Sequence, residues 1–194
     1  MNSVAIIPAA GLSRRMGEPK LLKPFEGEPL INHVLAAWLA SGVQRVIVVV
    51  REDNTNLREH LAQFDVDVAI ADPPPAQMKD TVLAGIKYTA EHYPMGVNDA
   101  FLLAPADMPY LSPWLIDQVI EQHNPDAAAI IAPSFENTKG HPALFPWPFV
   151  TGVYQLTDDQ GINALWDLYY GRTFEVGDNT PLIDLDTPED WQQE

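Results

Sequence analysis

Residues 4–20, VAIIPAAGLSRRMGEPK, contain the residue types that a phosphate-binding loop needs. The apolar run Val4–Ile7 predicts a buried strand, and the small residues Ala9–Gly11 follow it closely. Small side chains after a strand let backbone N–H groups approach an anion closely. Arg15 and Lys20 come next and could neutralise the charge of that anion. The spacing therefore predicts a nucleotide site in this loop.

Two other classes of phosphate loop are excluded by the glycine pattern. Gly11 lacks the companions of a G-x-G-x-x-G dinucleotide loop, and the chain contains no G-x-x-x-x-G-K-[ST] sequence. The arginines after Gly11 could instead be exposed for solubility alone. However, the chain has 11 lysines and arginines against 27 aspartates and glutamates, a net charge of −16. A cluster of cations in so acidic a chain favours anion binding.

Carboxylates follow two of the predicted strands. Asp107 comes soon after the apolar run Ala100–Leu103. Asp184 and Asp186 lie in the sequence LIDLDTP, which we expect to end the last strand. Ligands of open α/β sheets bind outside the carboxyl ends of the strands. Two carboxylates beside a cationic phosphate loop would suit Mg²⁺, which takes oxygen ligands together with phosphates.

Each carboxylate also has a purely structural interpretation. Asp107 could accept backbone N–H groups in the turn before Pro109. Thr187 and Pro188 are typical of a helix start, with Thr187 as the N-cap. That structural role is compatible with metal binding by Asp186.

His141 and an aromatic run are further candidates. His141 lies between a glycine and a proline, where it could orient a substrate or only fill a turn. The run FPWPF at residues 145–149 is expected to pack in the core, although it could line a pocket for a planar ligand. No arrangement of histidine, serine and acidic residues supports a zinc site or a hydrolase.

Composition limits the class of protein. With 194 residues, 46% of them hydrophobic, the chain can bury a full core, and we expect a single domain over residues 1–194. The net charge argues against nucleic acid or an anionic membrane as partner, because both bind basic surfaces. The absence of cysteine excludes disulfides and thiol nucleophiles. No signal peptide or spanning segment is visible, so we expect a cytoplasmic protein.

Apolar runs alternate with helical patterns along the chain. The predicted strands are Val4–Ile7, Val46–Val50, Val66–Ile70, Ala100–Leu103, Ala127–Ile131, Ala143–Phe145 and Phe174–Val176. The predicted helices are Leu30–Ala40, Asn54–Phe64, Asp80–His92, Pro113–His123 and Ile162–Tyr169. Ser112 is expected to cap the fourth helix. This order predicts an α/β fold with a doubly wound, mostly parallel sheet.

Four ordered motifs together resemble the nucleotidyltransferases of molybdenum cofactor synthesis, which share the MobA-like NTP transferase domain. The motifs are AAGLSRRMG with Pro19-Lys20 (residues 9–20), PADMP (105–109), GHP (140–142) and DLDTPED (184–190). Their order and distances match the family over nearly the whole chain. The resemblance implies a Rossmann-like α/β/α sandwich that transfers a nucleoside monophosphate from an NTP to a phosphorylated acceptor and releases pyrophosphate.

The resemblance also implies a role for each matching residue. The residues expected to bind the nucleotide are Ala9, Ala10, Gly11, Leu12, Ser13, Arg15, Lys20 and Thr81. Asp107 would bind Mg²⁺, with Asp186 as the second ligand. Arg15, Lys20 and Asp107 would be the catalytic residues, and His141 would contact the acceptor. The acceptor phosphate would attack the α-phosphorus directly, while metal and cations stabilise the developing charge.

The first motif bears on the choice of nucleotide. Ala-Ala-Gly at residues 9–11 resembles the cytidylyltransferase branch, whereas guanylyltransferases tend to have Ala-Gly-Gly. Ala10 therefore favours CTP, with molybdopterin as acceptor. GTP is an alternative nucleotide, and a sugar phosphate, methylerythritol phosphate or phospholactate is an alternative acceptor. A non-catalytic module that senses NTP or delivers finished cofactor to a molybdoenzyme is a further alternative.

One segment departs from the family pattern. The family has roughly G-x-S-x-S-L-x-x-G before the third major helix, where residues 76–85 read AQMKDTVLAG. Thr81 keeps a hydroxyl four residues before Gly85, but the glycine and the first serine are absent, and Lys79 and Asp80 appear. In the family this segment lies against the nucleobase and ribose, so the change bears on base choice.

Overall fold

The computed structural model describes residues 2–12, 16–17, 19–187 and 189–192. Its strands are β1 (Ser3–Pro8), β2 (Pro24–Phe25), β3 (Glu28–Pro29), β4 (Arg45–Arg51), β5 (Asp67–Ala71), β6 (Ala100–Leu103), β7 (Ile130–Phe135), β8 (Thr138–Lys139), β9 (Ala143–Pro146) and β10 (Gly171–Glu175). Its α-helices are α1 (Leu30–Leu39), α2 (Thr55–Leu61), α3 (Met78–His92), α4 (Pro113–Glu121), α5 (Val150–Gln155) and α6 (Leu165–Leu168). The predicted alternation of strands and helices is confirmed.

The main sheet is mixed and mostly parallel. Its strand order is β10-β7-β9-β6-β1-β4-β5, and β8 pairs with β7 outside this path. β1 lies between β4 and β6 and is parallel to both, and β5 is parallel to β4. β9 runs antiparallel to its neighbours β6 and β7. The carboxyl ends of β1, β4, β5 and β6 therefore meet at one edge, where ligands bind in sheets of this kind.

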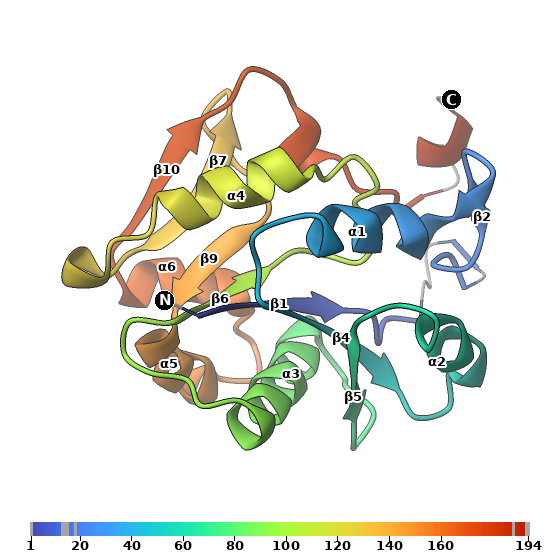
Figure 1. The fold of residues 1–194 in the computed structure, drawn as a ribbon, viewed down its shortest axis with the longest axis horizontal. Coiled ribbons are helices and arrows are strands. Elements are labelled where there is room, and N and C mark those ends of the chain that lie inside the picture. Colours follow the sequence, from blue (N-terminus) through green and yellow to red (C-terminus); the bar gives the residue numbers. More distant parts are fainter. Residues whose placement is uncertain (1, 13–15, 18, 188, 193–194) are drawn as a thin grey trace.

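Helices cover both faces of the sheet (Figure 1), which confirms the expected three-layer, Rossmann-like arrangement. Helices α1, α2 and α4 pack on one face, and α3, α5 and α6 pack on the other. Successive side chains of a strand point to opposite faces of the sheet. Because helices cover both faces, the strands are apolar at successive positions. In β1, Ala5 and Ile7 join the core beneath α1, whereas Val4 and Ile6 join the core against α3.

β7 begins three residues later than the sequence predicts. Ala127, the predicted first residue of this strand, instead ends a 3-10 turn over residues 125–127, and the Asn124 side chain accepts a hydrogen bond from the backbone N–H of Asp126 at 3.0 Å. Proline at the first position of the turn also favours this conformation, because its fixed φ suits a helical start. The antiparallel direction of β9, the short helix α5 and the β2–β3 hairpin are features that the sequence pattern missed.

The expectation that LIDLDTP ends a strand is wrong. Residues 180–182 form a 3-10 turn, and residues 183–187 belong to neither helix nor strand. The backbone N–H of Leu185 donates to the carbonyl oxygen of Asp107 at 3.0 Å, so it binds a loop rather than a neighbouring strand. The N–H and hydroxyl of Thr187 both donate to the carboxylate of Asp190, at the start of the 3-10 turn Asp190–Gln192.

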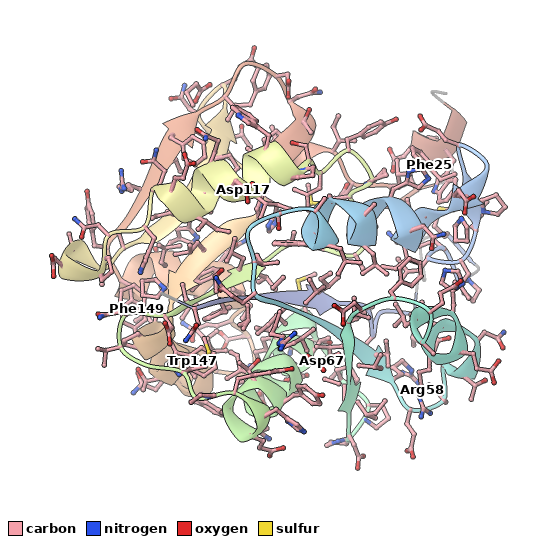
Figure 2. All side chains as sticks on the ribbon, viewed as in Figure 1. Phe25, Arg58, Asp67, Asp117, Trp147 and Phe149 are labelled. Carbon is pink, nitrogen blue, oxygen red and sulfur yellow. The ribbon has the colours of Figure 1, made fainter. Side chains whose placement is uncertain are left out.

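The aromatic run at residues 145–149 packs in the core, as we expected from the sequence. Phe145 stacks on Phe101 with ring centroids 5.0 Å apart, and Trp147 meets Phe101 edge to face. Phe149 stacks on Tyr169 with centroids 3.9 Å apart. Trp147 and Phe149 lie beside α5 on the face of the sheet that α3 also covers (Figure 2). These contacts account for the run without a planar ligand.

Helix starts follow from side-chain capping. The Ser112 side chain accepts a hydrogen bond from the N–H of Leu115 at 3.2 Å, which confirms it as the N-cap of α4. Asn54 caps α2 in the same way. In the described part of the chain, no helix is long and apolar enough to cross a lipid bilayer.

Gly85 lets α3 approach the sheet closely. A Cβ atom at this position would lie 2.6 Å from Ile6 Cγ2 and 2.9 Å from Val49 Cγ2. Both neighbours are fully buried β-branched side chains in the sheet, which cannot move aside easily. A glycine is therefore needed here for packing, and α3 is held against β1 and β4.

We expect Gly85→Ala to lower the free energy of unfolding by about 1–3 kcal/mol, because the added methyl overpacks the contact with the sheet. Urea denaturation followed by circular dichroism measures this change. Gly161→Ala is the matched control, because no atom lies within 4 Å of the added Cβ there. Equal stability of the two variants would show that α3 can shift without cost.

Candidate active site

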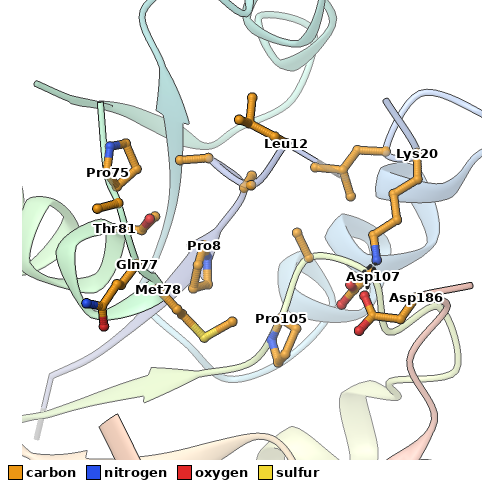
Figure 3. A pocket seen from close by; sticks show the side chains of 16 residues that line it. Pro8, Leu12, Lys20, Pro75, Gln77, Met78, Thr81, Pro105, Asp107 and Asp186 are labelled. Carbon is orange, nitrogen blue, oxygen red and sulfur yellow. Dashed lines mark hydrogen bonds and ion pairs between the residues drawn. The ribbon is translucent and has the colours of Figure 1, made fainter. Parts of the chain in front are cut away.

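A cavity of about 460 Å³ opens at the carboxyl edge of the sheet, beyond the ends of β1 and β6. The predicted site residues that line it are Ala9, Ala10, Gly11, Leu12, Lys20, Thr81, Asp107 and Asp186. Figure 3 shows Lys20, Asp107 and Asp186 together at one side of this pocket, with Thr81 and Gln77 on the opposite wall. The structure therefore brings most of the predicted residues together.

The loop after β1 forms one wall of the pocket. The N–H of Ala9 donates to the carbonyl of Val49 at 2.8 Å, which fixes the start of the loop against β4. Among the described residues, no atom lies within 4 Å of the place where a Cβ of residue 11 would be, so a glycine is not required there by packing against them. Ser13 and Arg15 lie outside the described residues, and their roles stay predictions.

The Lys20 ammonium is held between two carboxylates. Its Nζ lies 2.5 Å from Oδ2 of Asp107 and 2.6 Å from Oδ1 of Asp186. It also donates to the carbonyl oxygen of Leu185 at 2.9 Å. Only 8% of the Lys20 side-chain surface is exposed, so these contacts are largely shielded from water. Charged pairs in such surroundings are stronger than pairs on the surface.

Contacts of Leu185 and Asp190 position Asp186 at the pocket. Leu185 is buried against Phe25 and Leu30, and its N–H binds the backbone of Asp107. The Asp190 carboxylate accepts the backbone N–H of Asp186 at 3.0 Å. These contacts therefore fix the backbone at residues 185 and 186, although this segment is not part of a strand.

The charges at this end of the pocket shift two pKa values. Burial disfavours the charged form of Lys20, but Asp107 and Asp186 outweigh it and hold the pKa of Lys20 above its ordinary value. Partial desolvation raises the pKa of Asp184, and the negative charges of Asp107 and Asp186 raise it further. The pocket thus combines a cation that stays charged with an excess of carboxylates.

Comparison with known families agrees with these motifs. The MobA-like NTP transferase domain matches residues 5–173. The chain belongs to this family. The match covers the loop after β1, both sides of the pocket and Asp107, whereas Asp186 lies beyond its end.

Relatives of the chain include two kinds of nucleotidyltransferase. A probable molybdenum cofactor guanylyltransferase of Bacillus cereus is 31% identical over 126 residues, 65% of this chain and 59% of the relative. A 2-C-methyl-D-erythritol 4-phosphate cytidylyltransferase of Nitrosospira multiformis is 31% identical over 129 residues, 64% of this chain and 56% of the relative. Both alignments thus span less than two thirds of the relative's length.

Solved structures share the fold of this MobA-like chain. A nucleotidyl transferase from Methanothermobacter superposes with a TM-score of 0.81 at 22% sequence identity, covering 99% of this chain and 95% of the other. This likeness extends through the region of Leu185 and Asp186. It supports the three-layer fold from one end of the described chain to the other.

The carboxylates of Asp107 and Asp186 could supply some of the oxygen ligands of a hard divalent cation such as Mg²⁺. Oδ1 of Asp107 is buried and has no hydrogen-bond partner, so an acceptor oxygen stands ready at the pocket. Among the residues that the structure describes, no group of three or more histidine, cysteine or acidic side chains could hold a metal ion. Mg²⁺ commonly uses one or two carboxylates and completes its shell with phosphates and water. The prediction of Mg²⁺ is therefore compatible with this pair.

The opposite wall comes from the segment that departs from the MobA-like pattern. Pro75, Gln77, Met78 and Thr81 line the pocket, and the Thr81 side chain is buried. The Asp80 carboxylate accepts the N–H groups of residues 76 and 77 at 3.1 and 3.0 Å, which fixes the first turn of α3. Gln77 and Met78 were not predicted as site residues. Their position in the segment that departs from the family pattern could have indicated them.

Lys79, which is unusual for the family, points away from the pocket. Its side chain is buried, its Nζ donates to the carbonyl of Thr157, and it lies 3.5 Å from the Asp158 carboxylate. The Gln77 amide donates to the carbonyl of Asp158 at 2.6 Å. These side chains link the first turn of α3 to residues 157–160, so that this surface loop supports one wall of the pocket.

His141 does not line the pocket. Its Nδ1 lies 3.3 Å from the carbonyl oxygen of Leu103, and burial lowers the pKa of the imidazole against the opposing effects of that carbonyl and Asp107. The preceding Gly140 packs so closely on Pro181 that a Cβ would lie 2.4 Å from the proline Cβ. The motif thus has a packing role, and acceptor binding by His141 stays a prediction.

We expect Lys79→Met to lower the free energy of unfolding by about 1–3 kcal/mol, because it removes the charged donor of the partly buried hydrogen bond to the Thr157 carbonyl. Amide hydrogen exchange should become faster in residues 157–160 and in the first turn of α3. Mass spectrometry after exchange measures both regions. Lys87→Met, at an exposed position of the same helix, is the control. Unchanged exchange at residues 157–160 in Lys79→Met would contradict the link.

Proposed function

We propose that this MobA-like protein is a single-domain nucleotidyltransferase that moves a nucleoside monophosphate from an NTP to a phosphorylated acceptor and releases pyrophosphate. The observation that carries this proposal is the ion-paired cluster of Lys20, Asp107 and Asp186 at the pocket, next to a loop of small residues. Cations and carboxylates beside an open cavity are the parts that phosphoryl chemistry uses. The relatives of both named kinds support the same reaction class.

Each part of the pocket has a distinct task in the proposed reaction. The backbone from Ala9 to Leu12 holds the nucleotide, and Lys20 together with Arg15 neutralises the triphosphate. Asp107 and Asp186 would hold Mg²⁺, which would supply charge neutralisation at the phosphates when bound. An oxygen of the acceptor phosphate attacks the α-phosphorus as the bond between that phosphorus and the bridging oxygen of the leaving pyrophosphate breaks. No covalent bond to the protein forms.

CTP and molybdopterin are the proposed substrates. Ala10 in the first motif supports CTP, because it matches the cytidylyltransferase branch of the family. Relatives named for molybdenum cofactor support molybdopterin as the acceptor, and a molybdoenzyme would then receive the product. The same relatives are named as guanylyltransferases, so GTP is the competing nucleotide.

A second candidate reaction uses a polyol phosphate as acceptor. The relative named 2-C-methyl-D-erythritol 4-phosphate cytidylyltransferase, 31% identical to this chain, supports it. Pyrophosphate release should be measured with each NTP in the presence of molybdopterin, methylerythritol phosphate or a sugar phosphate. Turnover with one of the other acceptors but not with molybdopterin would reject the molybdopterin proposal. Binding of NTP without any turnover would favour a carrier or sensor.

We expect Asp107→Asn to lower the turnover number by a factor on the order of 10²–10³, because the loss of metal-assisted charge stabilisation is worth several kcal/mol. The coupled release of pyrophosphate measures turnover. Asp65→Asn, an exposed site away from the pocket, is the matched control and should keep full activity. Thermal unfolding checks that the variant folds. Unchanged turnover in folded Asp107→Asn would remove this carboxylate from the mechanism.

We expect Ala10→Gly to raise kcat/KM for GTP relative to CTP by about tenfold, because loss of one methyl group at the pocket makes room for the larger base. Initial rates with both nucleotides and the same acceptor give this ratio. Ala84→Gly, placed on α3 outside this pocket, tests for a general effect of added glycine. A ratio that does not change in Ala10→Gly would show that base choice is set elsewhere.

A further inference from the structure

The hydrogen-bonding capacity of the Lys20 ammonium is fully used by the protein. An ammonium group has three N–H donors. Among the described residues, its short contacts include Asp107 at 2.5 Å, Asp186 at 2.6 Å and the carbonyl of Leu185 at 2.9 Å. An ammonium in this position cannot donate to a phosphate unless at least one of these contacts breaks. In the proposed reaction Lys20 binds a phosphate, so its side chain must leave the position observed here.

The same ammonium lies where a shared metal ion would have to bind. An ion bound by both Asp107 and Asp186 must lie between the two carboxylates, about 2.0–2.1 Å from each oxygen for Mg²⁺. Lys20 Nζ already lies between them, only 2.5 and 2.6 Å from their oxygens. Two cations cannot share this space, because their mutual repulsion is strong at such short distances and low exposure. Lysine and metal ion therefore exclude one another there.

We propose that Lys20 closes the divalent-cation site of the free protein, and that a nucleoside triphosphate opens it by attracting the ammonium to its phosphate oxygens. This inference rests on the proposed function. Lysine is suited to such an exchange because its charge is carried on a flexible four-carbon chain. The backbones of Asp107 and Asp186, which are held by Leu185 and Asp190, stay in place while the ammonium moves. The buried, unpartnered Oδ1 of Asp107 then joins the opened site.

Coupled binding follows from this exchange. A divalent cation alone must displace the ammonium without offering it a new partner, so it binds weakly. A triphosphate offers that partner, so nucleotide and cation strengthen each other's binding, and the coupling is reciprocal. The protein is thereby protected from filling its carboxylates with a metal ion before the nucleotide arrives.

Binding of Mn²⁺ without nucleotide tests the proposal directly. Electron paramagnetic resonance measures free Mn²⁺ during a titration of the wild-type protein, Lys20→Met and Lys87→Met. We expect Lys20→Met to bind Mn²⁺ at least about tenfold more tightly than wild type, although it lacks turnover. The control Lys87→Met removes the same charge from an exposed position and should resemble wild type. The double variant Lys20→Met/Asp107→Asn should lose the gain, which would locate the ion.

Equal Mn²⁺ affinity in wild type and folded Lys20→Met would overturn the proposal. A second measurement needs no variant, in case Lys20→Met does not fold. In ¹⁵N-lysine-labelled wild-type protein, the Nζ resonance of Lys20 should shift when CTP or GTP is added with a chelator present. It should not shift with millimolar Mg²⁺ alone. A shift with Mg²⁺ alone, or none with either nucleotide, would also overturn it.

The outcomes separate this inference from the proposed function. Tighter Mn²⁺ binding by Lys20→Met, with no pyrophosphate release by wild type on any acceptor, would support the exchange and reject the transferase. Normal turnover of wild type with unchanged Mn²⁺ binding in Lys20→Met would reject the exchange and leave the transferase in place.

Discussion

The ion pairs of Lys20 with Asp107 and Asp186 are the interaction on which the rest of the site depends. They join three segments that are far apart in the chain: the loop after β1, the loop after β6 and the segment near the C-terminus. Partial exclusion of water strengthens the contacts, and the two carboxylates keep the lysine charged although burial opposes its charge. Without the lysine, two carboxylates would face each other at low exposure, which is costly for both.

Packing of helices on both faces of the sheet positions this cluster and the wall opposite it. Strands with apolar residues on both faces require a helix layer on each side, and the parallel order of β1, β4, β5 and β6 brings their carboxyl ends to one edge. Gly85 lets α3 lie close to β1, so that its first turn forms a wall of the cavity. The loop at residues 157–160 supports that wall from the side opposite the pocket through Lys79.

Much of the fold and of the pocket could be predicted from the sequence, because the signals are local. The apolar run at Val4–Ile7 and the small residues after it indicate a strand and an open loop without any tertiary information. Asp186 could be predicted as a site residue, but the irregular conformation of its segment could not. LIDLDTP has the alternation of a strand, whereas its N–H groups donate to Asp107 and Asp190 instead of to a neighbouring strand. The direction of Lys79 depends on a contact across 78 positions, which no local pattern contains.

The hydrogen bond between Leu185 and Asp107 has a consequence for the order in which the site forms. Strands β1, β4, β5 and β6 and the loop after β1 all lie within the first 109 residues of the chain. Lys20 can then meet Asp107 alone, and the carboxylate pair is complete only after about 80 further residues, up to Asp186, have been synthesised. A shortened chain that stops before Leu185 would keep most of its core but would have half of the carboxylate pair.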